Sequence, residues 1–129
     1  MNNERIWFFG DYDYSPILDM LQIKEIKTCV VYSFYNKNKE PIYIGKSISF
    51  LDRYDWHLRK QYAKEIEYIG FRLYKNEAEM ELAELFHIQK NIPKYNKASK
   101  YNYDLEMVSF KDFSTEEIFT RKNFDGYIF

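Results

Sequence analysis

Residues 28–47 read TCVVYSFYNKNKEPIYIGKS, and this stretch decides the fold. Two short segments of β-branched and aromatic residues flank a polar run of Asn, Lys and Glu, a pattern that predicts a β-hairpin. Pro41 cannot donate a hydrogen bond to a neighbouring strand, so we place it in the loop. The six residues 36–41 then form the loop, and Tyr35 pairs with Ile42.

This register determines which side chains share one face of the hairpin. It places Phe34 opposite Tyr43 and Tyr32 opposite Gly45. A slip of one residue would put the two tyrosines on opposite faces, because side chains alternate along a strand. We therefore expect both phenols on one face, with open space beside the Tyr32 ring where Gly45 has no side chain.

Residues 48–64 have the apolar spacing of an amphipathic helix. The predicted buried stripe of this helix consists of Leu51, Tyr54, Leu58 and Tyr62. A second stripe, well away from the first, consists of Arg53, His57, Lys60 and Lys64. Charged rows on helices are commonly solvated faces, and that interpretation stays open for this helix considered alone.

A half-buried strand is predicted over residues 66–74, and a helix over residues 77–91. Asn76 with Glu79 three residues later is a capping-box pattern that begins the helix, and Pro93 ends it. The helix residues predicted to face the core are Ala78, Leu82, Leu85 and Phe86.

Two polar residues of the second helix lie off its apolar stripe. Glu84 lies at the side of the stripe, and His87 lies near its back, where we expect no functional role. His57 and His87 are the only histidines, which leaves little room for a multi-histidine metal site. Gly-rich phosphate loops and paired Cys ligands are also absent from the sequence.

The N-terminal residues 1–27 are interpreted as an extension that docks on the core. Ser15 followed by Pro16 is a helix start, with Ser as the N-cap and Pro at the first helical position. Ile17, Leu18 and Leu21 then give a short amphipathic helix.

The C-terminal residues 99–129 are interpreted as a second extension. Residues 105–110 fit a strand, and Ser114 with Glu117 matches the capping box of a short helix. The end of the chain is rich in aromatic residues, and any of them left exposed would indicate a surface for a protein partner.

The composition indicates one ordered domain over residues 1–129, since 20% of the residues are aromatic and Gly and Pro are few. No run reaches the roughly 18 apolar residues of a membrane span, and no apolar leader opens the chain. We therefore expect a cytoplasmic protein without membrane contact. The single Cys29 excludes an internal disulfide, and we expect a buried, inert thiol.

The net charge of −1 argues weakly against a nucleic-acid partner, but the charges are unevenly distributed. Residues 30–64 carry seven basic and three acidic groups, and residues 87–100 carry four basic groups and no acidic ones. A chain that is neutral as a whole can therefore present a local surface that attracts phosphate.

The polar side chains of these stretches suit phosphodiester hydrolysis. Magnesium takes oxygen ligands, and one carboxylate with waters and a substrate phosphate is a usual arrangement. An arginine binds phosphate through two parallel hydrogen bonds. A phenol can deprotonate water if neighbouring cations lower its pKa.

The two hairpin strands carry a pair of related tripeptides. Val30-Val31-Tyr32 ends in tyrosine, and Tyr43-Ile44-Gly45 begins with one. Further on, Arg53 and His57 stand four residues apart, and Glu84 precedes a Pro-Lys-Tyr-Asn sequence that ends at Asn96.

In this order, these residues resemble the GIY-YIG nuclease family, and the resemblance covers residues 28–98. The second signature tripeptide is intact, whereas the first keeps its tyrosine and lacks its glycine. An arginine followed by a histidine is similar to the restriction-type branch of the family. The resemblance implies an α+β fold with a small three-stranded antiparallel sheet flanked by helices, in the order β-β-α-β-α.

The resemblance also implies a role for each matching residue. Tyr32 would be the general base or would position the attacking water, and Tyr43 would orient that water or bind the phosphate. Arg53 would stabilise charge in the transition state, and His57 would hydrogen-bond the phenol or the phosphate. Asn96 would hold the loop and the Glu84 region in place.

The implied metal ligand is Glu84, the one protein ligand of a Mg²⁺ or Mn²⁺ ion. Glu81, one turn earlier, is the alternative carboxylate, although the spacing to Asn96 favours Glu84. Lys46, Lys60 and Lys94 are the expected substrate contacts.

The leading hypothesis is a metal-dependent endonuclease that cuts one DNA phosphodiester bond per active site, as a stand-alone restriction-, repair- or phage-type member. The substrate would be duplex or branched DNA, and cutting both strands would require a homodimer or two successive nicks. The alternative is a nucleic-acid binding module that has the nuclease fold and little or no cleavage activity.

Overall fold

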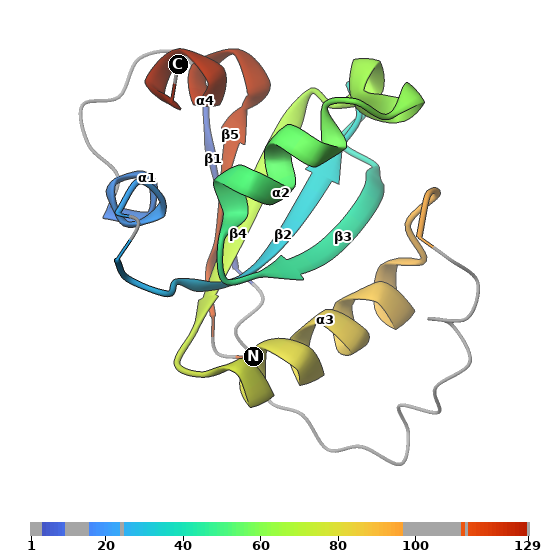
Figure 1. The fold of residues 1–129 in the computed structure, drawn as a ribbon. Coiled ribbons are helices and arrows are strands. Elements are labelled where there is room, and N and C mark those ends of the chain that lie inside the picture. The colour runs from blue at the N-terminus through green and yellow to red at the C-terminus, as the bar shows by residue number, and fades with distance from the viewer. Residues whose placement is uncertain (1–3, 10–15, 24, 97–111, 113, 129) are drawn as a thin grey trace.

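The computed structural model describes residues 4–9, 16–23, 25–96, 112 and 114–128. These residues form one five-stranded mixed sheet with helices packed against it (Figure 1). The strands are β1 (Arg5–Phe8), β2 (Cys29–Tyr35), β3 (Pro41–Ser47), β4 (Tyr68–Tyr74) and β5 (Glu116–Thr120). The helices are α1 (Pro16–Leu21), α2 (Phe50–His57), α3 (Glu77–Asn91) and α4 (Arg121–Ile128), with a 3-10 helix η1 (Gln61–Glu65) after α2.

The sheet has the order β1-β5-β4-β2-β3, so it is larger than the predicted three-stranded sheet. The predicted antiparallel strands β2, β3 and β4 are present. The two extensions add β5, antiparallel to β4, and β1, parallel to β5. They cover the edge that β4 would otherwise leave unpaired. The parallel pairing of β1 with β5 places Arg5 opposite Glu116. Because these residues are far apart in sequence, no local turn pattern predicts this pairing.

A buried carboxylate fastens the added strands to the sheet. Glu116 is 1% exposed and accepts hydrogen bonds from the Tyr35 hydroxyl at 2.7 and 2.9 Å. Glu116 also pairs with Arg5 at 3.1 Å and with the buried Arg72 at 3.4 Å. The Glu116 carboxylate of β5 thereby joins side chains from β1, β2 and β4. The sequence did not predict this network.

The helix predicted from Ser114 and Glu117 is wrong, because residues 116–120 are strand β5. The backbone N–H of Glu116 instead donates a hydrogen bond to the carbonyl of Glu4, next to β1. Helix α4 begins only at Arg121. The strand expected over residues 105–110 lies outside the described residues.

The hairpin register is confirmed at its centre and differs at its end. Tyr32 lies opposite Gly45 and Phe34 opposite Tyr43, as predicted. Tyr35, however, pairs with Pro41 rather than Ile42, because an irregularity between Phe34 and Tyr35 shifts the register. Pro41 is thus the first residue of β3 and not a loop residue, a position that a strand with a free edge tolerates.

The helix expected over residues 48–64 is interrupted. Helix α2 ends at His57, Lys60 has an extended backbone, and η1 begins at Gln61. The predicted basic stripe is therefore not continuous: His57 is fully buried, while Lys60 and Lys64 are exposed.

The predicted bounds of α3 are confirmed, and the side chain of Asn76 accepts a hydrogen bond from the Glu79 N–H at 2.9 Å. The predicted buried face is wrong in part, since Ala78 is exposed and Leu82 is 44% exposed, while Leu85 and Phe86 are half-buried. The buried residues of this helix are Met80, Ala83, Glu84, His87 and Ile88. The helix is rotated in this way because its small and flexible residues pack against the β2 and β3 side chains.

Two hydrophobic clusters hold the sheet between its helices. The larger cluster joins β-strand side chains to α1, α2 and α4, and the smaller one joins β2 and β3 to α3 (Figure 1). The predicted N-terminal helix is present, with Ile17, Leu18 and Leu21 buried. In the C-terminal helix, Phe124 is fully buried, so the aromatic end of the chain contributes to the core.

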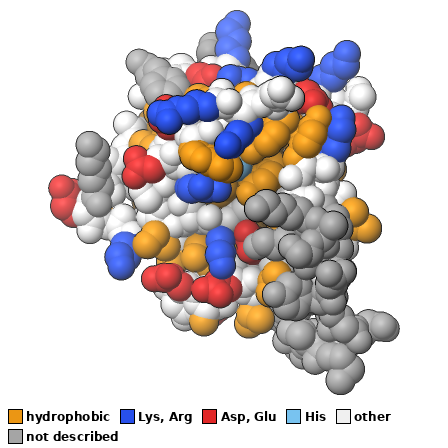
Figure 2. All heavy atoms as spheres, turned by 45° about the vertical axis from the view of Figure 1, so that its right-hand side comes forward, with side chains coloured by type: hydrophobic (Ala, Val, Ile, Leu, Met, Phe, Trp, Pro, Cys, Tyr) orange, Lys and Arg blue, Asp and Glu red, His pale blue; other side chains and the backbone are white. Residues whose placement is uncertain are grey.

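The surface beside β3 and η1 is mixed in character. Figure 2 turns this side of the molecule forward and shows Lys and Arg side chains interleaved with hydrophobic ones over its upper part. Cys29 is partly exposed at the start of β2, and not buried as predicted. Within the described ranges, no helix has both the length and the apolar character that crossing a membrane demands.

Candidate active site

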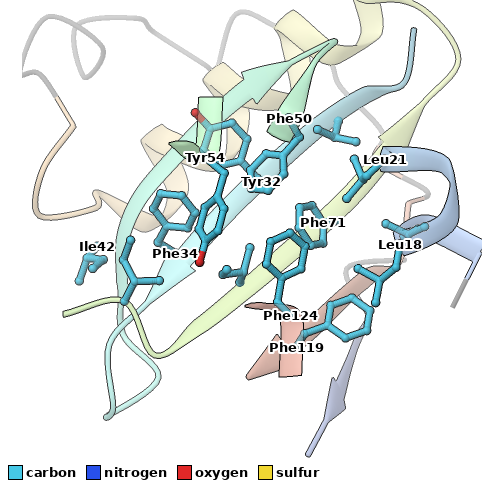
Figure 3. Close-up of a cluster of buried hydrophobic side chains, with 14 residues drawn as sticks. Leu18, Leu21, Tyr32, Phe34, Ile42, Phe50, Tyr54, Phe71, Phe119 and Phe124 are labelled. Atoms are coloured by element: carbon cyan, nitrogen blue, oxygen red, sulfur yellow. The ribbon is translucent and has the colours of Figure 1, made fainter. Parts of the chain in front are cut away.

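Tyr32 is the centre of the candidate site. It is fully buried in β2, with its ring between Phe34 and Phe50 (Figure 3). Its phenol lies directly over Gly45 of β3, where a Cβ atom would stand 2.5 Å from the Tyr32 oxygen. The prediction of open space at this point is wrong, because the phenol itself fills it. Glycine is required at position 45 by this close approach.

Tyr43 lies on the same face of the sheet, as the predicted register requires. The rings of Tyr32 and Tyr43 are stacked with their centroids 6.1 Å apart. The Tyr43 ring also contacts His57, with a centroid distance of 4.6 Å. Because Tyr43 is partly exposed and Tyr32 is not, Tyr43 is the tyrosine nearer the surface of the site.

His57 lies between two phenols. Its Nε2 atom is 2.8 Å from the Tyr32 hydroxyl, and its Nδ1 atom is 2.5 Å from the Tyr62 hydroxyl. Tyr62 was predicted as a core residue of one continuous helix. It reaches the imidazole because α2 ends at His57 and the chain returns through η1. The sequence holds no signal for this contact, since the helical pattern runs through the break.

Burial and the charges of Arg53 and Lys60 lower the pKa of His57 to about 4. The imidazole is therefore neutral at pH 7, with one nitrogen available to accept a hydrogen bond. Burial also raises the pKa of Tyr32, and the Tyr43 phenol and Glu84 carboxylate act in the same direction, against Arg53. The expected lowering of the phenol pKa by cations does not occur, because burial outweighs the effect of Arg53.

Arg53 is partly exposed on α2, near the two tyrosines. Burial lowers the pKa of its guanidinium, but its interactions with the Tyr32 and Tyr43 phenols outweigh this effect and raise it. Its guanidinium carbon is also 4.2 Å from the ring centroid of Trp56. The ammonium of Lys60 lies 3.9 Å from the same ring centroid. Trp56 was not singled out in the sequence.

The two candidate metal carboxylates have different surroundings. Glu84 is 5% exposed on α3 and lies near enough to raise the pKa of Tyr32. Glu81 is exposed and forms an ion pair with Lys46 at 3.7 Å. A carboxylate supplies hard oxygen ligands, which Mg²⁺ and Mn²⁺ prefer. The described residues contain no cluster of three or more His, Cys, Asp and Glu side chains that could hold a metal.

Asn96 lies against the outer edge of the sheet, where its side chain bonds the backbone of Ile44 in β3. Its side-chain oxygen accepts from the Ile44 N–H at 3.0 Å, and its amide donates to the Ile44 carbonyl at 2.8 Å. The neighbouring Tyr95 N–H donates to the Ile42 carbonyl at 2.8 Å. This segment therefore covers the free edge of β3 and holds the Tyr-Ile-Gly strand in place.

The three predicted substrate lysines are separated. Lys46 pairs with Glu81, and Lys94 pairs with Glu65 at 3.6 Å while lying 5.0 Å from the ring centroid of Tyr95. Lys60 lies over Trp56 beside the site. Of the three, Lys60 is the one whose charge acts on His57.

A second buried network surrounds His87. Its Nε2 atom hydrogen-bonds Asp112, which also accepts from the Tyr74 hydroxyl at 2.8 Å. The other oxygen of Asp112 accepts from the N–H and the hydroxyl of Ser114. These contacts hold the chain before β5 against α3 and β4.

No protein-family model matches the sequence, and no curated protein matches it. The chain is similar to solved structures of the GIY-YIG N-terminal endonuclease domain of UvrC from Thermotoga maritima. The structure bound to its catalytic divalent cation, magnesium, is 28% identical over 65% of this chain and 100% of that chain, with a TM-score of 0.48. A point mutant of the same domain, bound to its catalytic divalent cation, is 26% identical over 65% and 99%, also with a TM-score of 0.48. These domains carry the name of the family that the sequence motifs resemble.

Proposed function

We propose that this chain is a metal-dependent endonuclease of the GIY-YIG type that hydrolyses DNA phosphodiester bonds, with one active site per chain. The observation that supports it best is the buried contact between the Tyr32 phenol and the neutral His57, beside Arg53 and Glu84. This set combines a proton acceptor, a cation for phosphate and a carboxylate for a metal ion.

In the proposed reaction, Tyr32 and His57 act together as the general base. In the tautomer protonated at Nδ1, His57 donates to Tyr62 and accepts the Tyr32 proton at Nε2. A water attacking phosphorus gives a proton to the Tyr32 oxygen while the Tyr32 proton passes to His57. The phenol thus stays neutral before the reaction, which is consistent with its raised pKa.

Arg53 and Tyr43 bind the phosphate. The guanidinium presents two parallel N–H groups to phosphate oxygens and stabilises the charge that grows in the transition state. Tyr43, at the surface of the site, orients the phosphate or the attacking water.

Glu84 is the proposed protein ligand of Mg²⁺ or Mn²⁺, and waters and phosphate oxygens would complete the ligand set. When bound, the ion would stabilise negative charge on the phosphate. Asn96 positions the site by bracing β3 through Ile44. Cutting both strands of a duplex requires a homodimer or two successive nicks.

The test is cleavage of supercoiled plasmid with Mg²⁺ or Mn²⁺. We expect nicking by the wild type, loss of nicking with EDTA, and a loss of at least about 100-fold for Glu84→Gln, because its amide binds a hard cation poorly. Glu81→Gln is the matched control, one turn away on the same helix, and should cut like the wild type.

Absence of nicking on supercoiled, linear and branched DNA would contradict the nuclease proposal. Binding to the same DNAs without cutting would favour the nucleic-acid binding module instead.

A further inference from the structure

Trp56 is a large aromatic side chain next to the candidate site that the proposed reaction does not use. It is 40% exposed on α2, next in sequence to His57. Its ring lies nearly perpendicular to the imidazole, with centroids 4.9 Å apart and planes at 80°. Arg53 joins the ring to the site, since its guanidinium interacts both with Trp56 and with the two tyrosine phenols.

The second cation at this ring is easily displaced. Lys60 is exposed, and its ammonium lies 3.9 Å from the Trp56 ring centroid. Such a contact holds a solvated lysine on a flexible side chain only weakly. A planar group that stacks on the indole can therefore replace Lys60, whose ammonium is then free to pair with an anion.

The other aromatic rings near the site are less available. Tyr62 stacks on Tyr43 on one side, with centroids 6.0 Å apart, and contacts Tyr95 at 5.0 Å. Tyr32 is fully buried. Trp56 is thus the aromatic side chain of this site that is both exposed and flanked by cations.

We infer that Trp56 is a stacking platform for an unpaired nucleotide of the DNA substrate, next to the phosphate that is cut. The inference rests on the proposed function and specifies its substrate class: DNA with an overhang, flap, bulge or single-stranded segment. In an intact duplex both faces of a base are covered by its neighbours, so a fixed indole next to the site cannot stack on one. An unpaired base offers a free face, and the adjacent phosphates pair with Arg53 and Lys60.

The charges around Trp56 support a nucleic-acid occupant over an apolar protein partner. An interface with a protein core excludes lysine ammonium groups, whereas a nucleotide brings a ring and a phosphate together. Arg53 and Lys60, the two cations next to the Trp56 ring, match that combination.

The test uses Trp7→Phe, in which Trp56 is the one remaining tryptophan of the chain. Trp7 lies in β1, at the opposite edge of the sheet from β3, so this substitution also serves as a control. The full chain is titrated, without divalent metal, with single-stranded oligothymidylate and with a blunt duplex of the same length. We expect the single strand to quench Trp56 fluorescence and the duplex to leave it nearly unchanged.

Binding by Trp56→Ala is then measured by fluorescence anisotropy with labelled forms of the same two probes. We expect binding of the single strand to weaken about 5- to 150-fold, the range for loss of one stacked base. Binding of the duplex should change less than about two-fold, and Trp56→Phe should recover part of the loss because it keeps an aromatic face.

Equal quenching by both probes, no quenching, or an equal loss of binding to both would overturn the inference. The quenching experiment needs no substitution at position 56, so it decides the question even if Trp56→Ala folds poorly. Nicking of plasmid without any preference for unpaired DNA would overturn this inference alone. Stacking on Trp56 without cleavage would overturn the proposed nuclease function alone.

Discussion

The two histidines of the chain lie in two buried networks that differ in their partners. His57 faces the phenols of Tyr32 and Tyr62, with the cations Arg53 and Lys60 near by. His87 faces the carboxylate of Asp112. Both imidazoles have a lowered pKa, and burial is the largest cause for each. The networks therefore differ in what surrounds the ring and not in whether it is charged.

The two networks differ in whether a carboxylate bonds the histidine. In the His87 network, Asp112 accepts hydrogen bonds from His87, Tyr74 and Ser114, and these bonds hold the pKa of Asp112 far below its usual value although burial opposes them. That network is complete within the chain, as expected of a structural contact. In the His57 network neither ring nitrogen bonds a carboxylate, and the neighbouring charges are cationic. Such a site attracts an anionic ligand.

The largest expected effect is on catalysis. Tyr32→Phe removes the hydroxyl between the attacking water and His57, so the cleavage rate should fall about 10³-fold or more, in the range for loss of general-base catalysis. Tyr74→Phe removes the corresponding phenol of the His87 network and should leave the rate within about two-fold, at a cost of about 1 kcal/mol in stability. Single-turnover cleavage and urea unfolding measure the two quantities. If Tyr32→Phe and Tyr74→Phe lost cleavage rate equally, the His57 network would not be catalytic in a way that the His87 network is not.

The second effect is on stability. Asp112→Asn keeps the volume of the side chain but replaces one acceptor oxygen with an amide NH₂ group. That group then faces side chains that themselves donate hydrogen bonds. We expect the free energy of unfolding to fall by about 3 kcal/mol, as when one partner of a buried charged contact is lost. Cleavage measured below the unfolding transition should stay near the wild-type rate. A variant of unchanged stability that no longer cuts DNA would place the His87 network in the reaction.

A third prediction concerns the close approach of two hairpin strands. Gly45→Ala places a Cβ atom 2.5 Å from the Tyr32 oxygen, so the phenol must move. A displacement of about 1 Å in a reacting group is expected to lower the cleavage rate about 100-fold.

Gly126→Ala is the control, because a Cβ atom there meets nothing within 4 Å. It lies in α4, and it should raise stability by about 0.5–1 kcal/mol without changing the rate. A Gly45→Ala protein that cuts at the wild-type rate would show that the position of the phenol is not critical.

The smallest effect is a pH dependence of stability. His57 has a pKa of about 4 in the folded chain and about 6.5 when unfolded, so the unfolded state binds more protons between these values. Stability therefore decreases as the pH falls through this window, by about 2 kcal/mol between pH 7 and pH 5 from His57 alone.

His57→Gln lacks this titration, so its unfolding free energy should depend less on pH over the same interval. His87 also has a lowered pKa and contributes equally to the pH dependence of stability in the wild type and in His57→Gln. The difference in pH dependence between the two proteins therefore measures the contribution of His57. Denaturant unfolding at pH 7, 6 and 5 provides it. The same slope in both proteins would mean that His57 is not held neutral by its surroundings.

The local pattern predicted the hairpin and the second helix well, because their signals are short-range. Alternation and a polar turn fixed Tyr32 opposite Gly45, and Asn76 with Pro93 bounded the helix at Glu77–Asn91. The apolar pattern failed on the face of that helix, where Leu82 is exposed and Glu84 is buried. Which side a helix buries depends on the side chains it meets, and the facing strands are far away in sequence.

The sequence predicted which residue types lie in the candidate site, but not how they contact one another. Tyr32, Tyr43, Arg53 and His57 are brought together, but His57 was expected on a basic stripe and is fully buried. Tyr62 and Trp56 were not predicted for the site. The contact of Tyr62 follows from the end of α2 at His57, which the continuous helical spacing of residues 48–64 conceals.

The sequence by itself determined the hairpin strands, the strand after them and helix α3, because strand alternation, capping and turn chemistry act between near neighbours. It did not determine the break between α2 and η1. The tertiary structure alone decided that the chain ends join the sheet as β1 and β5. It also decided that His57 is neutral between two phenols. Strand pairing and burial depend on residues that are distant in sequence, and burial sets the protonation of a histidine.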